Sequence, residues 1–298
     1  MPLVTSKEII TKGYQEGYAV GAFNAVNMES AQAIIGAAME LHSPLIMQIT
    51  QTTLKYTEFD ELAAMAKVLI DRSGIPVALH LDHGRTYEVV MKCLKLGFSS
   101  VMIDGSLRED GKTPRTYEEN VAITQKAIEP AHALGVTVEG EIGTLGQIGT
   151  TEAGALTDPD QAAQFVEDTG VDTLAVAIGT THGLYRREPF IDIDRLKAIR
   201  SKVSIPLVLH GGTGTPDDAI RAAVQSGIAK INIDTFIRVA FYDAVWKVMD
   251  ETRKEHEEAD RKGEPRKYDI RKVLGPARDA MKAAVEDRMN VFGSPGKA

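Results

Sequence analysis

The chain has 298 residues, of which 43% are hydrophobic and 26% are charged, a composition that is typical of globular proteins and argues against disorder. Acidic residues outnumber Lys and Arg by 42 to 34, and the net charge of −8 argues against nucleic-acid binding, which depends on basic surface. The single cysteine, Cys93, excludes an internal disulfide and a cysteine-rich zinc site.

No apolar run approaches the roughly 18 residues that a membrane-spanning helix needs. The first ten residues also lack the basic region and apolar stretch of a signal peptide. We therefore expect a cytoplasmic protein with no membrane partner and no nucleic-acid partner.

Short apolar runs recur along the chain, and most are continuous, which is typical of parallel strands that are buried on both faces. The predicted strands span residues 18–23, 44–49, 76–81, 99–104, 136–141, 173–178, 206–210 and 229–233. Helical spacing of apolar residues, Asp-Pro starts and glycine ends predict helices between them. These helices span residues 28–42, 158–170, 196–201, 216–227 and 236–256.

Eight strands at about 30 residues per unit predict an α/β fold, the (β/α)8 TIM barrel. The alternative is a doubly wound open sheet, but the usual GxGxxG fingerprint after the first strand is missing here. We expect one TIM-barrel domain over residues 1–298, including a C-terminal helical extension over about 257–298. Residues 271–292 predict an extra helix outside the barrel, and the charged stretch 250–267 is interpreted as a solvated helix end and loop.

Three of the seven histidines stand near the ends of predicted strands, each followed by glycine. His83 ends the third strand, His182 follows the sixth by a few residues, and His210 ends the seventh. Barrel closure brings the carboxyl ends of the strands to one mouth, and catalytic zinc takes three protein ligands. A single histidine at a strand end could merely form a hydrogen bond with a backbone carbonyl. Three histidines at equivalent positions near the mouth of the barrel instead predict a metal site. His80 is interpreted as a packed, hydrogen-bonded residue.

Acidic side chains accompany these histidines. Asp82 directly precedes His83 and is a candidate for acid–base catalysis or for support of a metal-bound imidazole. Asp104 ends the fourth strand, and Glu139 and Glu141 share one face of the fifth. Buried acids need partners, which a metal or the histidines could provide. A purely structural role stays open for both glutamates, more so for Glu139.

Glycine-rich stretches at 179–183 and 210–214 follow strands six and seven, and the run 232–235 leads from strand eight into a helix. Loops and a helix N-terminus at these positions form the recurrent phosphate site of TIM barrels. The alternative is that the glycines only make tight turns and that Thr215 and Thr235 only cap helices. Two adjacent loops favour the phosphate site. The side chains that would assist there are Thr213, Thr235 and, toward a substrate hydroxyl, Asp234.

Motifs along almost the whole chain, in order, resemble those of the class II, metal-dependent fructose-bisphosphate aldolases. They are GAFN at 21–24, HLDHG at 80–84, SVMIDGS at 100–106, VEGE at 138–141, AVAIGT at 175–180 with His182-Gly183, LHGG at 209–212, INIDT at 231–235 and FGS at 292–294.

The resemblance implies a barrel enzyme of glycolysis, a lyase that works as a homodimer or homotetramer. It implies reversible cleavage of fructose 1,6-bisphosphate into dihydroxyacetone phosphate and glyceraldehyde 3-phosphate. Tagatose 1,6-bisphosphate or another ketose phosphate is the alternative substrate. The implied cofactor is a divalent metal, usually Zn²⁺, with a second metal or a monovalent cation beside it.

The resemblance also assigns roles to residues. His83, His182 and His210 would bind the metal, and Asp82 would exchange a proton with the C4 hydroxyl of the substrate. Asp104 and Glu141 match acids near the metal, where a second or displaced ion would sit. The matching substrate-binding residues are Asn24, Gly183, Arg186, Gly211, Thr213, Asn232, Asp234, Thr235 and Arg271, the last toward a neighbouring subunit's substrate.

Several positions depart from the family pattern. The loop 143–154 carries Glu152 as its only acid where the family commonly has a pair, which leaves the base that acts at C3 open. Phe236 stands where an acid is frequent, Ile270 where proline is usual, and the loop within 106–120 is longer. These changes surround the far end of the substrate.

Other enzyme classes fit the sequence less well. A metal hydrolase on a barrel would favour His or Asp after the first or eighth strand, where Asn24 and Asn232 stand. A Schiff-base aldolase needs a lysine near the mouth, but Lys230 is interpreted as beginning strand eight at the opposite end, and Lys55 lies beyond strand two. A non-catalytic phosphate- or metal-binding barrel would not need Asp82.

Overall fold

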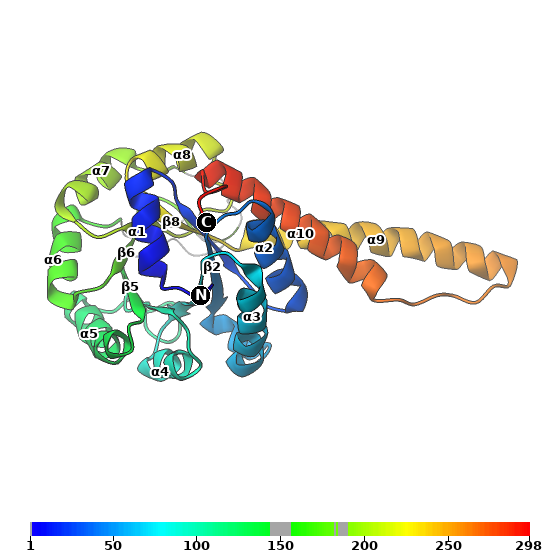
Figure 1. The fold of residues 1–298 in the computed structure, drawn as a ribbon, viewed down its shortest axis with the longest axis horizontal. Helices are drawn as coiled ribbons and strands as arrows, with labels where there is room; N and C mark the ends of the chain where they lie inside the picture. The colour runs from blue at the N-terminus through cyan, green and yellow to red at the C-terminus, as the bar shows by residue number, and fades with distance from the viewer. Residues whose placement is uncertain (1, 144–155, 182, 184–189) are drawn as a thin grey trace.

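Eight parallel strands close into a barrel in their order along the chain (Figure 1). The computed structural model describes residues 2–143, 156–181, 183 and 190–298. Every strand is buried along its length, as expected when helices cover the outside and side chains fill the inside. The strands are β1 (Val20–Asn24), β2 (Leu45–Thr50), β3 (Val77–Gly84), β4 (Ser100–Ile103), β5 (Thr137–Ile142), β6 (Thr173–Val176), β7 (Leu207–Leu209) and β8 (Ile228–Ile233).

Helices cover the outside of the barrel. In the described part of the chain they are α1 (Ser6–Glu16), α2 (Met28–Glu40), α3 (Phe59–Ser73), α4 (Tyr87–Lys95), α5 (Tyr117–Ala133), α6 (Pro159–Thr169), α7 (Ile193–Lys202), α8 (Asp217–Gln225), α9 (Thr235–Lys262) and α10 (Arg271–Phe292), with a short 3-10 turn, η1 (Gln51–Lys55), after β2. Local sequence explains several ends: Thr5 and Thr116 form capping boxes, and α6 begins at Asp158-Pro159 and ends before Gly170. No described helix is both long and apolar enough to cross a membrane.

The structure confirms the predicted TIM barrel, and the strand ends differ from the prediction by no more than a few residues. The helix predicted at 236–256 runs on to Lys262, so the expected start of the extension near 257 falls inside α9. Charge pairs one turn apart, Asp250 with Lys254 and Glu258 with Lys262, support this continuation in water. The helix ends where Gly263 adopts a left-handed φ of 68°.

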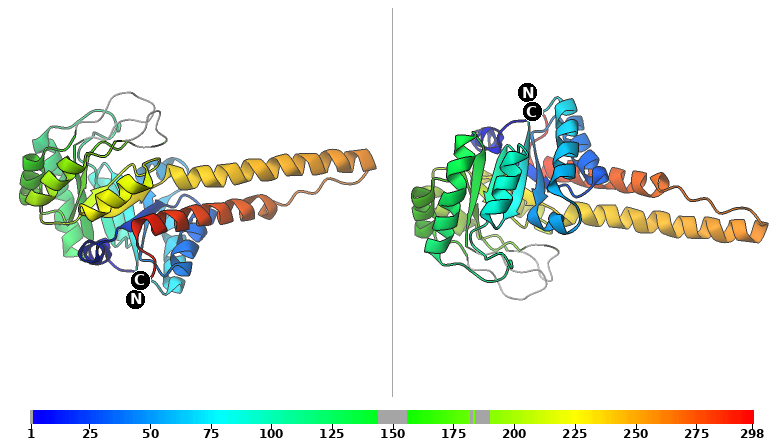
Figure 2. Two further views of the ribbon diagram at one scale, coloured as in Figure 1. Left: turned by 90° about the horizontal axis from the view of Figure 1, so that it is seen from above. Right: turned by 90° about the horizontal axis from the view of Figure 1, so that it is seen from below.

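Helices α9 and α10 form an arm that runs away from the barrel side by side (Figure 2). The inner end of α10 is tied to the barrel, where Phe292 stacks on Phe23 with ring centroids 6.5 Å apart. The outer part has no such support, and of the 28 residues of α9 only Ile237 is buried. Most of the α9 surface is therefore not covered by its own chain.

Candidate active site and metal centre

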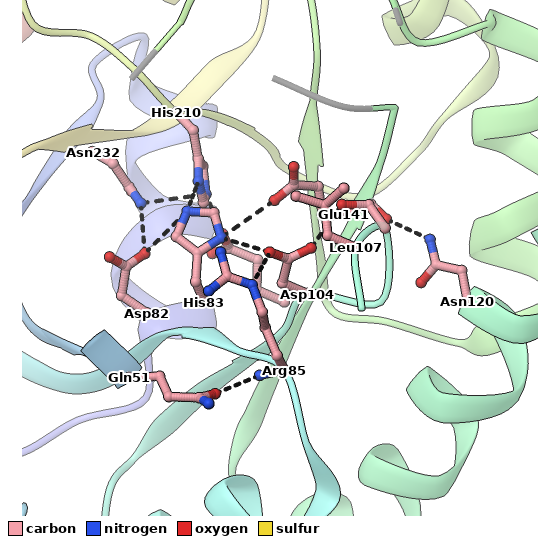
Figure 3. A network of polar contacts seen from close by, with 12 residues as sticks. Gln51, Asp82, His83, Arg85, Asp104, Leu107, Asn120, Glu141, His210 and Asn232 are labelled. Carbon is pink, nitrogen blue, oxygen red and sulfur yellow. Dashed lines mark hydrogen bonds and ion pairs between the residues drawn. The ribbon is translucent and has the colours of Figure 1, made fainter. Parts of the chain in front are cut away.

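A cavity of about 480 Å³ opens at the carboxyl ends of the strands, a volume within the range of small-molecule sites. Side chains from distant parts of the chain converge on it (Figure 3). Its lining includes Asn24, Gln48, Thr50, Asp82, His83, Arg85, Asp104, Lys112, Glu141, Gly183, Gly211, Thr213, Asn232, Asp234, Thr235 and Arg238.

A bulge at the end of β3 aims two adjacent residues into this cavity. The pairing of β3 with β4 shifts between Leu81 and Gly84, so β3 contains one extra residue there. His83 adopts a left-handed φ of 49°, which is strained for a residue with a side chain. Side chains of successive strand residues normally point to opposite faces, and the bulge is what lets both Asp82 and His83 line the cavity.

Two imidazoles meet at the centre of the site. Nε2 of His83 lies 3.1 Å from Nδ1 of His210. Ligands about 2.0–2.1 Å from a tetrahedral zinc ion would lie about 3.3–3.4 Å apart, so this spacing fits two nitrogens that share one ion. The other ring nitrogens face carboxylates, with His83 Nδ1 3.0 Å from Asp104 Oδ2 and His210 Nε2 2.9 Å from Glu139 Oε1. Metal-bound histidines are oriented by carboxylates in this way.

Asp104 and Glu141 lie on the far side of His83 from His210. Asp104 also accepts a hydrogen bond from Ser106 at 2.7 Å, which holds it as an acceptor beside the His83 ring. Oε2 of Glu141 is buried and makes no hydrogen bond to any described residue, and it lies 3.7 Å from His83 Nδ1. Since one ligand atom each of His83, Asp104 and Glu141 lies within 4.8 Å of the others, this group could hold a second or displaced cation.

Two amides hold Asp82. Nδ2 of Asn24 donates to one carboxylate oxygen at 3.0 Å, and Nδ2 of Asn232 donates to the other at 3.2 Å. Oδ1 of Asp82 also lies 3.9 Å from His83 Nε2, which places the carboxylate at the edge of the imidazole pair. Asp82 can therefore accept a proton from a group bound at that pair.

The charges of the site shift its pKa values. Burial lowers the pKa of His83, but Asp82 and Asp104 outweigh that effect and raise it to about 9. Burial and Asp104 raise the pKa of Glu141 to about 8. Burial raises the pKa of Asp82, but His83 and His210 outweigh it, so the pKa lies below its ordinary value. A cation that bound this cluster near pH 7 would therefore have to displace protons from His83 and Glu141, whereas Asp82 is already ionised.

The loop after β7 meets the first turn of α9. Gly211 has a left-handed φ of 69°, and a Cβ there would lie 2.4 Å from the backbone oxygen of Thr181, so the turn requires glycine. Oγ1 of Thr213 accepts a hydrogen bond from the backbone N–H of Phe236 at 3.3 Å. Asp234, the N-cap of α9, makes no side-chain cap hydrogen bond. Instead of a self-capped helix, the cavity wall presents a helix start that suits an anion.

Three basic residues that we did not select from the sequence also line the cavity: Arg85, Lys112 and Arg238. Nε of Arg85 lies 3.5 Å from Asp104 Oδ2, and its guanidinium packs against Gly111, where a Cβ would lie 3.2 Å from Cζ. Arg238 pairs with Asp234 at 2.6 Å. Arg238 lies in the first turn of α9, whereas Arg85 and Lys112 lie in the connections after β3 and β4. The only sequence signal was that Arg85 follows the HLDHG motif directly.

Three of the residues predicted from the sequence, His182, Arg186 and Glu152, fall outside the described residues. The Arg271 side chain is 88% exposed on the arm and is not among the described residues that line the cavity of its own chain.

Glu139 and Lys230 lie inside the barrel rather than in the cavity lining. Lys230 is the third residue of β8, not its first, and its Nζ lies 2.6 Å from Glu139 Oε2 with both side chains buried. An ammonium group enclosed in this way cannot reach a substrate carbonyl, so Lys230 cannot act as a Schiff-base lysine. The reason is its buried pairing with Glu139 and not, as predicted, its position at the start of the strand. His80 is buried beside this pair, as predicted from the sequence.

Known proteins similar to this chain agree with the geometry. The family described as "Fructose-bisphosphate aldolase class-II" matches residues 4–297. Fructose-bisphosphate aldolases of Thermus caldophilus and Geobacillus stearothermophilus are 42% and 40% identical, and each alignment covers at least 99% of both chains. The solved structure of the YdjI aldolase from Escherichia coli K12 matches with a TM-score of 0.83 at 33% identity over 99% of both chains. The resemblance found in the motifs is confirmed, and the chain belongs to the class II fructose-bisphosphate aldolase family, whose members are in general metal-dependent.

Proposed function

We propose that this aldolase cleaves fructose 1,6-bisphosphate reversibly into dihydroxyacetone phosphate and glyceraldehyde 3-phosphate. The observation that carries the proposal is the position of Asp82 beside the His83–His210 pair, with both amide donors in place. The names of the relatives support fructose 1,6-bisphosphate as the substrate. Tagatose 1,6-bisphosphate remains the alternative, since the two sugars differ only in the configuration at C4.

We assign the metal to His83 and His210, with His182 as the third ligand on the ground of the motif alone. The spacing of the two ring nitrogens and their carboxylate partners support Zn²⁺. When bound, the ion would supply Lewis-acid stabilisation of the negative charge that develops when the C3–C4 bond breaks. Asp104 and Glu141 remain candidates for a second ion or a monovalent cation.

The protein's own part in the reaction is proton transfer and binding. In cleavage, the Asp82 carboxylate takes the proton of the C4 hydroxyl, the C4–O bond becomes a carbonyl, and the electron pair of the C3–C4 bond stays on C3. Because Asn24 and Asn232 hold both carboxylate oxygens, Asp82 is oriented before substrate arrives. A second acid must then protonate C3, and Glu152 is the candidate from the sequence.

The two phosphate groups would bind at separate places. The Gly211 turn, Thr213 and the start of α9 offer backbone N–H groups and a hydroxyl for the phosphate of the dihydroxyacetone half, with Gly183, Thr235 and Arg186 as further candidates. Arg85 and Lys112 offer positive charge on the wall formed after β3 and β4. We assign them, with Arg238, to the distal phosphate.

The arm supports a homodimer or homotetramer. Tyr242, Trp246 and Met249 follow one another at helical spacing on α9 and are 64%, 71% and 49% exposed. An apolar stripe of this kind on a projecting helix is typical of a surface that a partner covers. A second copy of the chain could also present Arg271 to this chain's substrate. The expected place in glycolysis and in the cytoplasm belongs to the same proposal.

One assay tests the function. Cleavage of fructose and tagatose 1,6-bisphosphates would be measured as purified, after chelation, and after Zn²⁺ is added back. We expect the fructose compound to be the better substrate, activity to vanish on chelation, and Zn²⁺ to restore it. Full activity in chelator, together with inactivation by borohydride in the presence of substrate, would refute the metal mechanism. Preference for the tagatose compound would refute only the substrate assignment.

A further inference from the structure

Beneath the metal site, four polar side chains and the His210 ring form a continuous buried chain of contacts through the barrel. Nζ of Lys230 lies 2.6 Å from Glu139 Oε2 and 3.3 Å from His80 Nε2, and His80 Nδ1 lies 2.7 Å from Ser100 Oγ. Oε1 of the same Glu139 lies 2.9 Å from His210 Nε2. All five side chains are at most 1% exposed, and they come from strands β3, β4, β5, the β7 end and β8.

A barrel core does not need such a chain for stability. Taking an ammonium and a carboxylate out of water costs about as much as their attraction returns, and apolar residues of similar volume often serve the fold equally well. The interior of a TIM barrel is normally filled by branched apolar side chains. A lysine and a glutamate at these positions therefore suggest a task other than packing.

The hydrogen-bonding capacity of each group determines where the protons lie. An ammonium only donates, so Nε2 of His80 must accept, and its Nδ1–H donates to Ser100. Glu139 accepts from Lys230 at Oε2 and has Oε1 left to accept from His210. Nε2 of His210 must then carry its hydrogen. In a neutral ring this puts the lone pair on Nδ1, the nitrogen that faces His83.

One further contact competes with this tautomer. Nδ2 of Asn232 lies 3.3 Å from His210 Nε2 and could donate to it only if that nitrogen carried no hydrogen. Asn232 instead donates to Asp82 at 3.2 Å. Glu139 is therefore the acceptor that selects the tautomer of His210.

We propose that Lys230 and Glu139 are positioning residues that hold His210 as the Nε2–H tautomer and aim its Nδ1 lone pair at the metal. The inference rests on the proposed metal site. Lys230 acts through Glu139: without the ammonium, Oε2 loses its donor inside the barrel and the carboxylate no longer has a fixed orientation toward His210. Neither residue needs to touch the substrate.

Two variants test the two interactions, that of Lys230 with Glu139 and that of Glu139 with His210. Lys230→Met keeps a long side chain but removes the donor to Glu139. Glu139→Gln keeps the size but lets the amide donate to His210, which permits the Nδ1–H tautomer that cannot bind a metal. The control is Arg288→Met, which removes a buried arginine that pairs with the half-exposed Asp217 at 2.9 Å, between α10 and α8 and outside the metal site.

The measurements need no substrate. The dissociation constant for Zn²⁺ is obtained by competition with a chromophoric chelator, and the geometry of the site is read from the visible absorption of bound Co²⁺. We expect both variants to bind Zn²⁺ about 10–100-fold more weakly and to change the Co²⁺ spectrum, as for loss of other carboxylates that orient metal-bound histidines. Arg288→Met should leave both unchanged, although it lowers the melting temperature.

An unchanged Zn²⁺ affinity and Co²⁺ spectrum in folded Lys230→Met and Glu139→Gln would overturn the proposal and leave the pair a packing role. If Lys230→Met does not fold, Glu139→Gln decides alone, because it is nearly isosteric. If the wild-type chain itself binds no Zn²⁺, the proposed metal-dependent function is refuted. That outcome differs from failure of this inference, in which the wild-type chain binds Zn²⁺ and the two variants bind it equally well.

Discussion

Nδ2 of Asn24 donates to Oδ2 of Asp82 at 3.0 Å, joining the end of β1 to the end of β3 across the mouth of the barrel. Asp82 is buried, yet it remains an acceptor for two amides and keeps a pKa below its ordinary value. It is therefore ionised at neutral pH, as a group that removes a hydroxyl proton should be.

Replacing Asp82 by alanine should lower kcat for fructose 1,6-bisphosphate cleavage by about 10²–10⁴-fold, the usual contribution of a positioned acid–base group. The Zn²⁺ content should stay near the wild-type value, because the histidines remain. Asp71→Asn, at an exposed position on α3, is the matched control and should behave as wild type. Wild-type turnover in Asp82→Ala would remove this residue from its role.

Metal binding should depend on pH in a defined direction. The pKa of His83 is raised from 6.5 to about 9 and that of Glu141 from 4.5 to about 8, so both hold a proton in the metal-free protein at pH 7. Because both pKa values are higher in the folded protein than in the unfolded chain, these two bound protons stabilise the folded state. That stabilisation is complete below the pKa of each group in the unfolded chain, and it is lost as the pH rises through the folded-state values of about 8 and 9. A metal needs deprotonated ligands, so its affinity increases over the same range.

We therefore expect the rise in melting temperature on adding Zn²⁺ to be larger at pH 8 than at pH 6. Calorimetry in buffers of different ionisation enthalpy should show proton release on binding at pH 7. In Glu141→Gln the dependence should be shallower, since one titrating group is lost. An equal thermal shift at both pH values would contradict the linkage.

Arg85→Gln should raise KM for fructose 1,6-bisphosphate by about 10-fold or more, since a hydrogen bond to a charged group contributes about 1.5–3 kcal/mol. Cleavage of fructose 1-phosphate, which has no distal phosphate, should change little. Arg108→Gln is the control, because that side chain is 51% exposed and pairs outward with Glu119. Equal effects of Arg85→Gln on both substrates would place Arg85 away from the distal phosphate.

Trp246→Glu should shift the protein from a dimer or tetramer to a smaller species in light scattering. A charge there would be buried without a partner if a second copy covers the α9 stripe. Leu134→Glu, at a 63% exposed position after α5, should leave the assembly unchanged. A wild-type chain that is monomeric at micromolar concentration would refute the proposed assembly.

The amino-acid sequence was enough to predict the barrel and where its mouth lies. Eight continuous apolar runs, each about one strand long, can satisfy their backbone hydrogen bonds only by pairing, and histidines followed by glycine mark the strand ends. The same local signals placed Asp82, His83 and Asn24 at the cavity, and His210 beside His83. They could not show that a bulge in β3 lets Asp82 and His83 face the same cavity.

Tertiary structure alone decided the partners of each group. Glu139 and Lys230 are 91 residues apart, and no local pattern relates them, but barrel closure buries them 2.6 Å from each other. Arg85 follows β3 directly, but Lys112 lines the same cavity only because the loop after β4 folds over the end of β3, where Gly111 packs against Arg85. Periodicity reports which face of an element is buried, whereas charge pairing and tautomers depend on distances between elements that only the closed barrel sets.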